Sequence, residues 1–123
     1  MIEALHHDQI LEHGGLPGLR DPGALEATLN RARRKWAYDP DASVASLAAA
    51  YAFGIARSHP FHDGNKRMAF LAMMIFVERN GWLLDATDSD AVETIMELAS
   101  GDLTEPKLTT WIEARLRRRA RPK

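Results

Sequence analysis

The sequence predicts an almost entirely α-helical fold, and three observations support this prediction. Valine, which is enriched in strands, occurs only at positions 44, 77 and 92. No segment sustains an alternation of apolar and polar residues, whereas several segments repeat apolar residues at helical intervals. The chain has 123 residues, of which 46% are hydrophobic and 27% charged, as in ordinary globular domains. We therefore expect one compact all-α domain over residues 1–123.

Composition also excludes several classes of protein. The formal net charge is -1, so no overall positive field attracts nucleic acid or an acidic membrane. The absence of cysteine excludes a disulfide scaffold, a thiolate zinc cluster and a cysteine nucleophile, and it fits a reducing compartment. The first 15 residues are too polar for a signal peptide, and no apolar run reaches the roughly 18 residues of a membrane span. We expect a cytoplasmic protein without a membrane or direct nucleic-acid partner.

The N-terminal third predicts two helices. Apolar residues at positions 2, 5 and 10 indicate a first helix that ends at Gly14-Gly15, because glycine readily adopts the left-handed conformation. Asp21 can cap a second helix with Pro22 at its first position, and this helix should run to about Arg33.

Residues 33–43 interrupt the helical pattern with charged and aromatic residues and a proline. They predict an exposed loop or short hairpin, which is either a plain connector or a docking site for another molecule. Within it, the residues considered for docking a substrate are Lys35, Trp36 and Tyr38.

The middle of the chain predicts two central helices. Residues 43–58 combine apolar residues with many alanines, which favours a helix packed on several sides. Residues 68–77 are more apolar still, and this helix should end at Asn80-Gly81. Its methionines are interpreted as core residues.

The C-terminal third predicts a short extended segment and two helices. Residues 81–87 are extended, and Asp88 or Ser89 caps a helix that Gly101 closes. Thr104 caps a last helix that continues to Leu116. We interpret the basic residues of the tail as complementing the negative end of that helix, the alternative being an acidic partner; they are Arg115, Arg117, Arg118, Arg119, Arg121 and Lys123.

The loop between the two central helices contains residues that packing alone does not explain. Pro60 disfavours helical geometry at His59, so the preceding helix should end near position 58, and the next should begin at position 64 or 65. Lys66 and Arg67 then lie in a first turn, which already carries about half a positive charge. Two cations there are unfavourable unless an anion binds with them. Together with free backbone N–H groups and a glycine, they predict a site for a phosphate.

Three further residues of this loop suggest a chemical role. Asp63 can bind Mg²⁺, which typically takes one or two protein carboxylates and completes its shell with water and phosphate oxygens. His59 can act as a general base for an attacking hydroxyl. Phe61 should anchor the loop in the core. The alternatives are a capping role for Asp63, a structural hydrogen-bonded role for His59, and solvated surface cations.

Residues 59–67, HPFHDGNKR, resemble the signature of the Fic family, and in detail its Doc ("death on curing") branch. Residues 14–23, GGLPGLRDPG, also resemble an early segment of that branch, whose members are toxins of bacterial toxin–antitoxin pairs. The resemblance implies a compact Fic-type helical bundle that uses ATP and Mg²⁺ to modify a protein hydroxyl. It implies His59 as the base and Asp63 as the metal ligand. The residues implied in holding phosphates are Gly64, Asn65, Lys66, Arg67 and Arg57.

Departures from the family pattern bear on which group is transferred. Adenylyl-transferring Fic enzymes usually have glycine where Lys66 stands, and a second arginine where Phe70 stands. The resemblance to the Doc branch therefore implies transfer of the terminal phosphoryl group to a threonine of elongation factor Tu, arresting translation and growth. Adenylyl transfer is the alternative. Gly64 replaces an alanine of the best-known Doc type, and Leu71 replaces an asparagine.

The resemblance also implies a partner, an antitoxin whose disordered C-terminal segment folds as a helix into a groove. Two other functions are weighed. A catalytically silent module would keep the fold to bind partners such as the antitoxin, without catalysing a reaction. A metal phosphohydrolase of the HD type would use the adjacent His62 and Asp63 with further ligands drawn from His6, His7, His13, Asp85 and Asp90.

Overall fold

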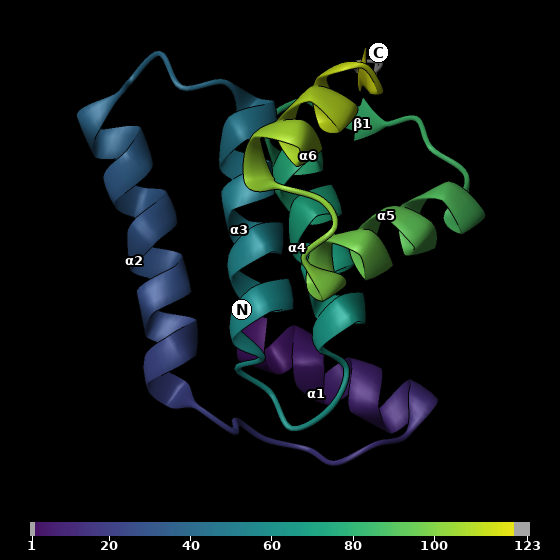
Figure 1. Cartoon of the computed structure of the whole chain (residues 1–123). Coiled ribbons are helices and arrows are strands. Elements are labelled where there is room, and N and C mark those ends of the chain that lie inside the picture. The colour runs from purple at the N-terminus through teal and green to yellow at the C-terminus, as the bar shows by residue number, and fades with distance from the viewer. Residues whose placement is uncertain (1, 120–123) are drawn as a thin grey trace.

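The computed structural model describes residues 2–119, which form six helices and one small sheet and so confirm the all-α prediction. Figure 1 shows α3 and α4 at the centre, running in opposite directions, with α1 crossing beneath them. None of the helices described is both long and apolar enough to span a bilayer. In chain order the elements are α1 (Ile2–His13), α2 (Pro22–Tyr38), α3 (Val44–Ser58), α4 (Asn65–Arg79), β1 (Trp82–Leu84), α5 (Asp88–Ser100), α6 (Glu105–Glu113) and β2 (Leu116–Arg118).

The core is built around α3, which packs against α2, α4, α5 and α6. Its buried small side chains let neighbouring helices approach closely, as the alanine pattern predicts. At Gly54 any β-carbon would collide with Thr28 of α2. From α4, Met68 and Met73 are fully buried, which confirms that these two methionines fill the core. The buried alanines of α3 are Ala45, Ala48, Ala49, Ala50, Ala52 and Ala56.

Helix α2 is longer than the sequence indicates, and the predicted loop over residues 33–43 is wrong for most of its length. The helix continues to Tyr38 and ends just before Pro40, because the residue preceding a proline disfavours helical geometry. Its last turns are held against α3 by the buried Ala32 and by Lys35, whose Nζ donates to the Ser46 carbonyl at 3.3 Å. The proposed docking residues are therefore helical.

The last helix is shorter than predicted, ending at Glu113 rather than Leu116. Residues 116–118 instead form β2, which pairs antiparallel with the predicted extended segment, now β1. The guanidinium carbon of Arg118 lies 4.9 Å from the Trp82 ring centre, and Arg117 pairs with Asp85. These long-range contacts favour strand over helix. The tail residues Arg121 and Lys123 lie outside the described residues.

Helix starts follow the predicted chemistry with one correction. Asp21 caps α2 and Ser43 caps α3, each accepting a backbone N–H at 3.0 Å. Thr104 caps α6 as predicted. At α5 the cap is Thr87 rather than Asp88 or Ser89, because those two residues already lie inside the first turn.

Candidate active site

The predicted loop joins α3 to α4 over residues 59–64, at the end of the bundle where α1 and residues 14–21 also lie (Figure 1). Helix α3 ends at Ser58, as Pro60 predicts. His59 is exposed and adopts the left-handed conformation, with φ 49° and ψ 59°. It is the only non-glycine residue with positive φ in residues 2–119. No hydrogen bond to its imidazole occurs there, so nothing supports a purely structural histidine.

Phe61 anchors the loop, as predicted, with 1% of its surface exposed. The side chain of Asn65 closes the loop on Phe61: its Oδ1 accepts from the Phe61 N–H at 3.0 Å, and its Nδ2 donates to the Phe61 carbonyl at 2.9 Å. The ring of His6 stacks on Phe61, with centroids 3.9 Å apart and planes inclined by 14°. The amide of Asn65 thus shapes the loop, and its predicted contact with phosphate stays a prediction.

Residues 14–21 lie along the loop and hold its backbone. The Arg20 N–H donates to the Pro60 carbonyl at 2.8 Å, and the His62 N–H donates to the Gly18 carbonyl at 3.2 Å. The Arg20 guanidinium adds two bonds of 2.7 Å, from Nε to the His59 carbonyl and from Nη2 to the Ser58 carbonyl. Sequence reasoning missed Arg20, because its partners lie almost 40 positions away.

Asp63 is exposed and fixed from two directions. Its Oδ2 accepts from the Leu16 N–H at 2.7 Å, and its carbonyl lies 2.7 Å from Nε2 of His6. His6 is 3% exposed. Sequence reasoning weighed it only as a metal ligand and missed its contact with the loop, although its spacing of four from Ile2 and Ile10 places it on the same helix face. The carboxylate does not cap α4, which excludes that alternative. Within residues 2–119 no hydrogen bond reaches Oδ1, so this oxygen can face a metal ion.

The start of α4 carries no cap. Its N-cap residue is Gly64, in the left-handed conformation at φ 79°, and no side chain accepts from the first turn. Lys66 and Arg67 are exposed, and in the described part of the chain neither lies within ion-pair distance of a carboxylate. Both line a cavity of about 570 Å³ between α1, α4 and α5. The other lining residues are Gln9, His13, Phe70, Leu71, Asp88, Val92, Ile95 and Met96.

The remaining predicted site residues are Arg57, in the last turn of α3, and three residues of α2. The Arg57 guanidinium lies 5.9 Å from the Phe53 ring centre, and its Nη1 would be 3.1 Å from a β-carbon at Gly101. Its phosphate contact stays a prediction. Lys35, Trp36 and Tyr38 lie at the opposite end of α2 from the loop (Figure 1). The structure does not bring these three to the site.

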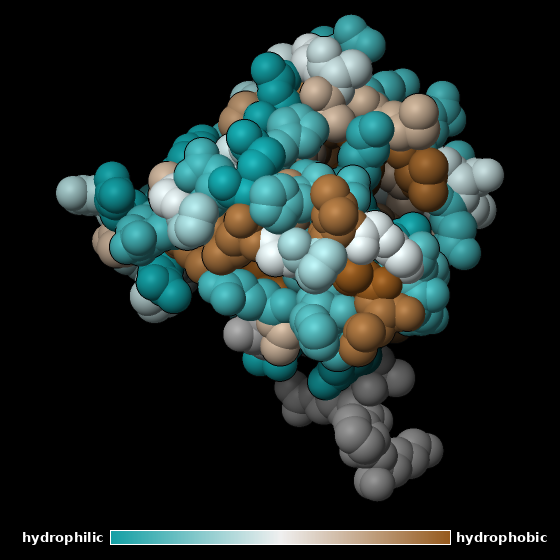
Figure 2. Space-filling model, turned by 90° about the horizontal axis from the view of Figure 1, so that it is seen from below, coloured by the Kyte–Doolittle hydropathy of each residue, from teal (hydrophilic) through white to brown (hydrophobic). Residues whose placement is uncertain are grey.

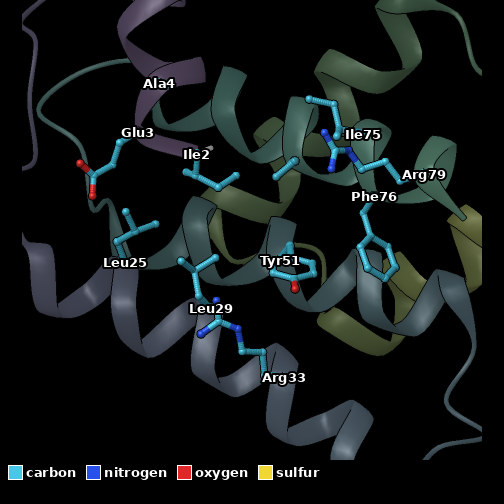
Figure 3. A pocket seen from close by; sticks show the side chains of 11 residues that line it. Ile2, Glu3, Ala4, Leu25, Leu29, Arg33, Tyr51, Ile75, Phe76 and Arg79 are labelled. Atoms are coloured by element: carbon cyan, nitrogen blue, oxygen red, sulfur yellow. The ribbon is translucent and has the colours of Figure 1, made fainter.

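A second cavity, of about 640 Å³, lies between α1, α2, α3 and α4. Its lining is mostly apolar, and Figure 3 shows Arg33 of α2 and Arg79 of α4 at its edges. Figure 2 shows that apolar side chains also gather in the middle of the face seen from below, surrounded by hydrophilic ones. The apolar lining residues labelled in Figure 3 are Ile2, Ala4, Leu25, Leu29, Ile75 and Phe76.

Comparison with known proteins gives consistent matches. A family model described as "Fic/DOC family" matches residues 1–77. Over 78 residues the chain is 41% identical to protein kinase doc of Escherichia phage P1, covering 63% of this chain and 62% of that protein. Over 110 residues it is 34% identical to toxin Doc of Mycolicibacterium smegmatis, covering 83% of this chain and 85% of that protein. The match to the phage protein thus spans less than two thirds of its length.

Proposed function

The chain belongs to the Fic/DOC family, and from this premise we propose that it is the toxin of a bacterial toxin–antitoxin pair. It transfers the terminal phosphoryl group of ATP to a hydroxyl group, that of a threonine, on a translation factor such as elongation factor Tu. Growth arrest follows. The observation that carries the proposal is the start of α4, which follows the loop of His59 and Asp63. Within residues 2–119 this helix start has no side-chain cap, and its two cations have no ion-pair partner.

The start of α4 is suited to a polyphosphate. The positive end of the helix dipole and the first-turn N–H groups favour an anion, and a left-handed glycine lets it approach the backbone closely. Lys66 and Arg67 add two positive charges on the same turn. The adjoining cavity has an apolar side formed by Phe70, Val92 and Met96, which suits a nucleoside.

In the proposed reaction His59 accepts the proton of the attacking hydroxyl. A bond forms between that oxygen and the terminal phosphorus as the bond from phosphorus to the bridging oxygen breaks, and ADP leaves with the electron pair. The transition state spreads negative charge over three oxygens, so positioning and charge neutralisation contribute most. Lys66, Arg67 and the first-turn N–H groups would face this charge.

The donor set near the loop fits Mg²⁺. Oδ2 of Asp63 is held by the Leu16 N–H, which orients the carboxylate and leaves Oδ1 for a metal. One carboxylate is a usual protein contribution to a nucleotide-bound Mg²⁺, whose other ligands are water and phosphate oxygens. When bound, the ion supplies positive charge to the phosphates.

The proposed antitoxin inserts a helix into the cavity between α1 and α2. The apolar lining suits the apolar face of an amphipathic helix, and Arg33 and Arg79 at its edges favour acidic residues on that helix. Adding the C-terminal segment of the antitoxin as a free peptide should therefore protect the backbone amides of α1 from hydrogen exchange.

A single incubation tests the proposed reaction. Purified protein, ATP, Mg²⁺ and a bacterial lysate are combined, and the mass added to modified proteins is measured. A phosphoryl increment on elongation factor Tu is the expected result. An adenylyl increment would favour the alternative transfer and show that Lys66 does not set the reaction. No increment with ATP bound would point to a silent binding module, and no nucleotide binding would overturn the proposal.

His59→Ala tests the base. We expect growth arrest to be lost, with transfer reduced on the order of 10²–10⁴-fold, while the fold and ATP binding persist. Toxicity retained at equal expression would contradict this role. His62→Ala is the matched control, because His62 is exposed in the same loop and only an HD-type site needs it. Within residues 2–119 no three metal-ligating side chains come together, which disfavours that site.

A further inference from the structure

The guanidinium of Arg20 contacts the two peptide groups on either side of His59. The Ser58 carbonyl belongs to the peptide plane before the His59 Cα, and the His59 carbonyl belongs to the plane after it. Arg20 donates to both oxygens at 2.7 Å through two nitrogens of one rigid fork. Because the two planes define φ and ψ of His59, this single side chain restrains the direction of its Cα–Cβ bond.

The conformation of His59 needs such a restraint. Left-handed geometry is unfavourable for a residue with a β-carbon, and φ here is 49°. Pro60 follows without an N–H that could bond back to the helix. The last carbonyls of α3 carry the negative end of its dipole, so a cation is favoured there. The Arg20 guanidinium supplies that cation and both donors.

The backbone around Arg20 is held without its side chain. Arg20 and Asp21 N–H groups donate to the Pro60 carbonyl at 2.8 and 3.1 Å, and Leu19 forms an isolated bridge with Phe61. Truncating Arg20 should therefore leave residues 18–21 on the loop and remove only the restraint on His59. Both guanidinium bonds are exposed, so little folding stability is expected from them.

We propose that Arg20 is a positioning residue for His59, which it holds in the left-handed conformation that aims the imidazole at the acceptor hydroxyl. The kinetic part of this inference rests on the proposed function. The conformational part does not, since the geometry of His59 can be measured in the free protein.

The kinetic test compares Arg20→Ala, Arg20→Lys and the control Arg34→Ala, which removes an exposed arginine from α2. For Arg20→Ala we expect kcat to fall on the order of 10²-fold, as for a misplaced catalytic group, with KM for ATP unchanged. Arg20→Lys keeps the charge but lacks the fork, so it should rescue only in part. Guanidinium ion at concentrations too low to unfold the protein should restore Arg20→Ala, and ammonium should not.

The conformational test uses backbone NMR shifts of His59 in wild-type and Arg20→Ala protein. Loss of the left-handed signature in the variant, at an unchanged melting temperature, is expected. Retention of that signature, or a fall in kcat that guanidinium cannot restore, would overturn the proposal. Absence of any transfer by the wild type would count against the proposed function instead, and the NMR comparison would still decide the role of Arg20.

Discussion

The first turns of α4 and α5 differ in every feature that stabilises the start of a helix. Helix α5 begins after Thr87, whose hydroxyl accepts from the Asp90 N–H at 3.1 Å, and two aspartates lie in its first turn. Helix α4 begins after Gly64, which offers no side-chain cap, and its first turn holds a lysine, an arginine and no acidic residue. One helix satisfies its own N-terminus, and the other leaves it open.

The difference indicates where a ligand belongs. A missing cap and two cations at a helix start forgo about 2 kcal/mol in total relative to a start like that of α5. Within residues 2–119 no carboxylate lies within ion-pair distance of the cations of α4. A bound anion would restore both the dipole interaction and the hydrogen bonds. Of these two helix starts, the less stable one is thus the one suited to bind phosphate.

Lys66→Glu would shift the first-turn charge of α4 toward that of α5, and we expect opposite effects on folding stability and on ATP binding. ATP affinity should fall on the order of 10²-fold or more, because an attraction worth roughly 1.5–3 kcal/mol becomes a repulsion. The free energy of unfolding should rise by about 0.3–1 kcal/mol through the helix dipole. Calorimetry with ATP and Mg²⁺, and urea unfolding, measure the two effects.

Lys107→Glu is the matched control, since Lys107 is an exposed lysine in the first turn of α6, where Thr104 caps the helix. It should raise stability to a similar extent and leave ATP affinity unchanged. Equal affinities in both variants would mean that the start of α4 holds no phosphate.

His6 of α1 contacts the segment that precedes α4, through a hydrogen bond to the Asp63 carbonyl and a stack on Phe61. His6→Phe keeps a ring on Phe61 but removes the donor to the Asp63 carbonyl, whereas His6→Gln keeps a donor without the ring. We expect His6→Phe to lower the free energy of unfolding by about 1–2 kcal/mol. It should also raise the Mg²⁺ concentration needed for ATP binding, and His6→Gln should not. Matching Mg²⁺ dependence in the two variants would contradict a role in placing Asp63; His7→Phe is the exposed control.

Local signals were enough to predict the boundaries of the site. Pro60 located the end of α3, because a proline disfavours helical backbone angles at the residue before it. Gly64 located the start of α4, because glycine readily adopts backbone angles outside the helical region. The burial of Phe61 followed from one aromatic residue in a polar loop. These features depend on residues a few positions apart, so sequence alone can give them.

Contacts between distant segments were not predictable in the same way. The hydrogen bonds from Arg20 to the backbone at His59 join residues about 40 positions apart. The stack of His6 on Phe61 joins residues 55 positions apart, and no periodicity encodes either contact. The strand β2 replaced a predicted helical turn because Trp82 and Asp85 offered partners to its arginines. The site's residue types were therefore predictable, but not the side chains that hold them in place.

Thr87→Ala removes the side-chain cap of α5, so that this helix start lacks a cap as that of α4 does. Removing the cap should lower the free energy of unfolding by about 1 kcal/mol, because the Asp90 N–H loses its acceptor. ATP affinity should change far less than in Lys66→Glu, since Thr87 itself does not line the cavity at the start of α4. Ser89→Ala is the control, as Ser89 is an exposed hydroxyl in the same turn that caps nothing. Equal losses in urea unfolding for the two variants would show that the hydroxyl of Thr87 is not the stabilising cap.

The smallest effect concerns α6, whose first-turn Glu105 is bound by Arg31 through two contacts of 2.6 Å. These hydrogen bonds lower the pKa of Glu105. A folded pKa below the unfolded value of about 4.3 means that the pair stabilises the protein above that pH. The contribution disappears as the pH falls through the folded pKa. Because Arg31 is half-exposed, the contribution of the pair should be about 0.5 kcal/mol.

Urea unfolding of Glu105→Gln tests this contribution. The variant should have a lower free energy of unfolding than the wild type at pH 7 and an equal one at pH 2, where the pair no longer contributes. The control Glu93→Gln, at an exposed glutamate of α5, should match the wild type at both pH values. An equal loss at pH 2 would assign the effect of Glu105 to packing rather than charge.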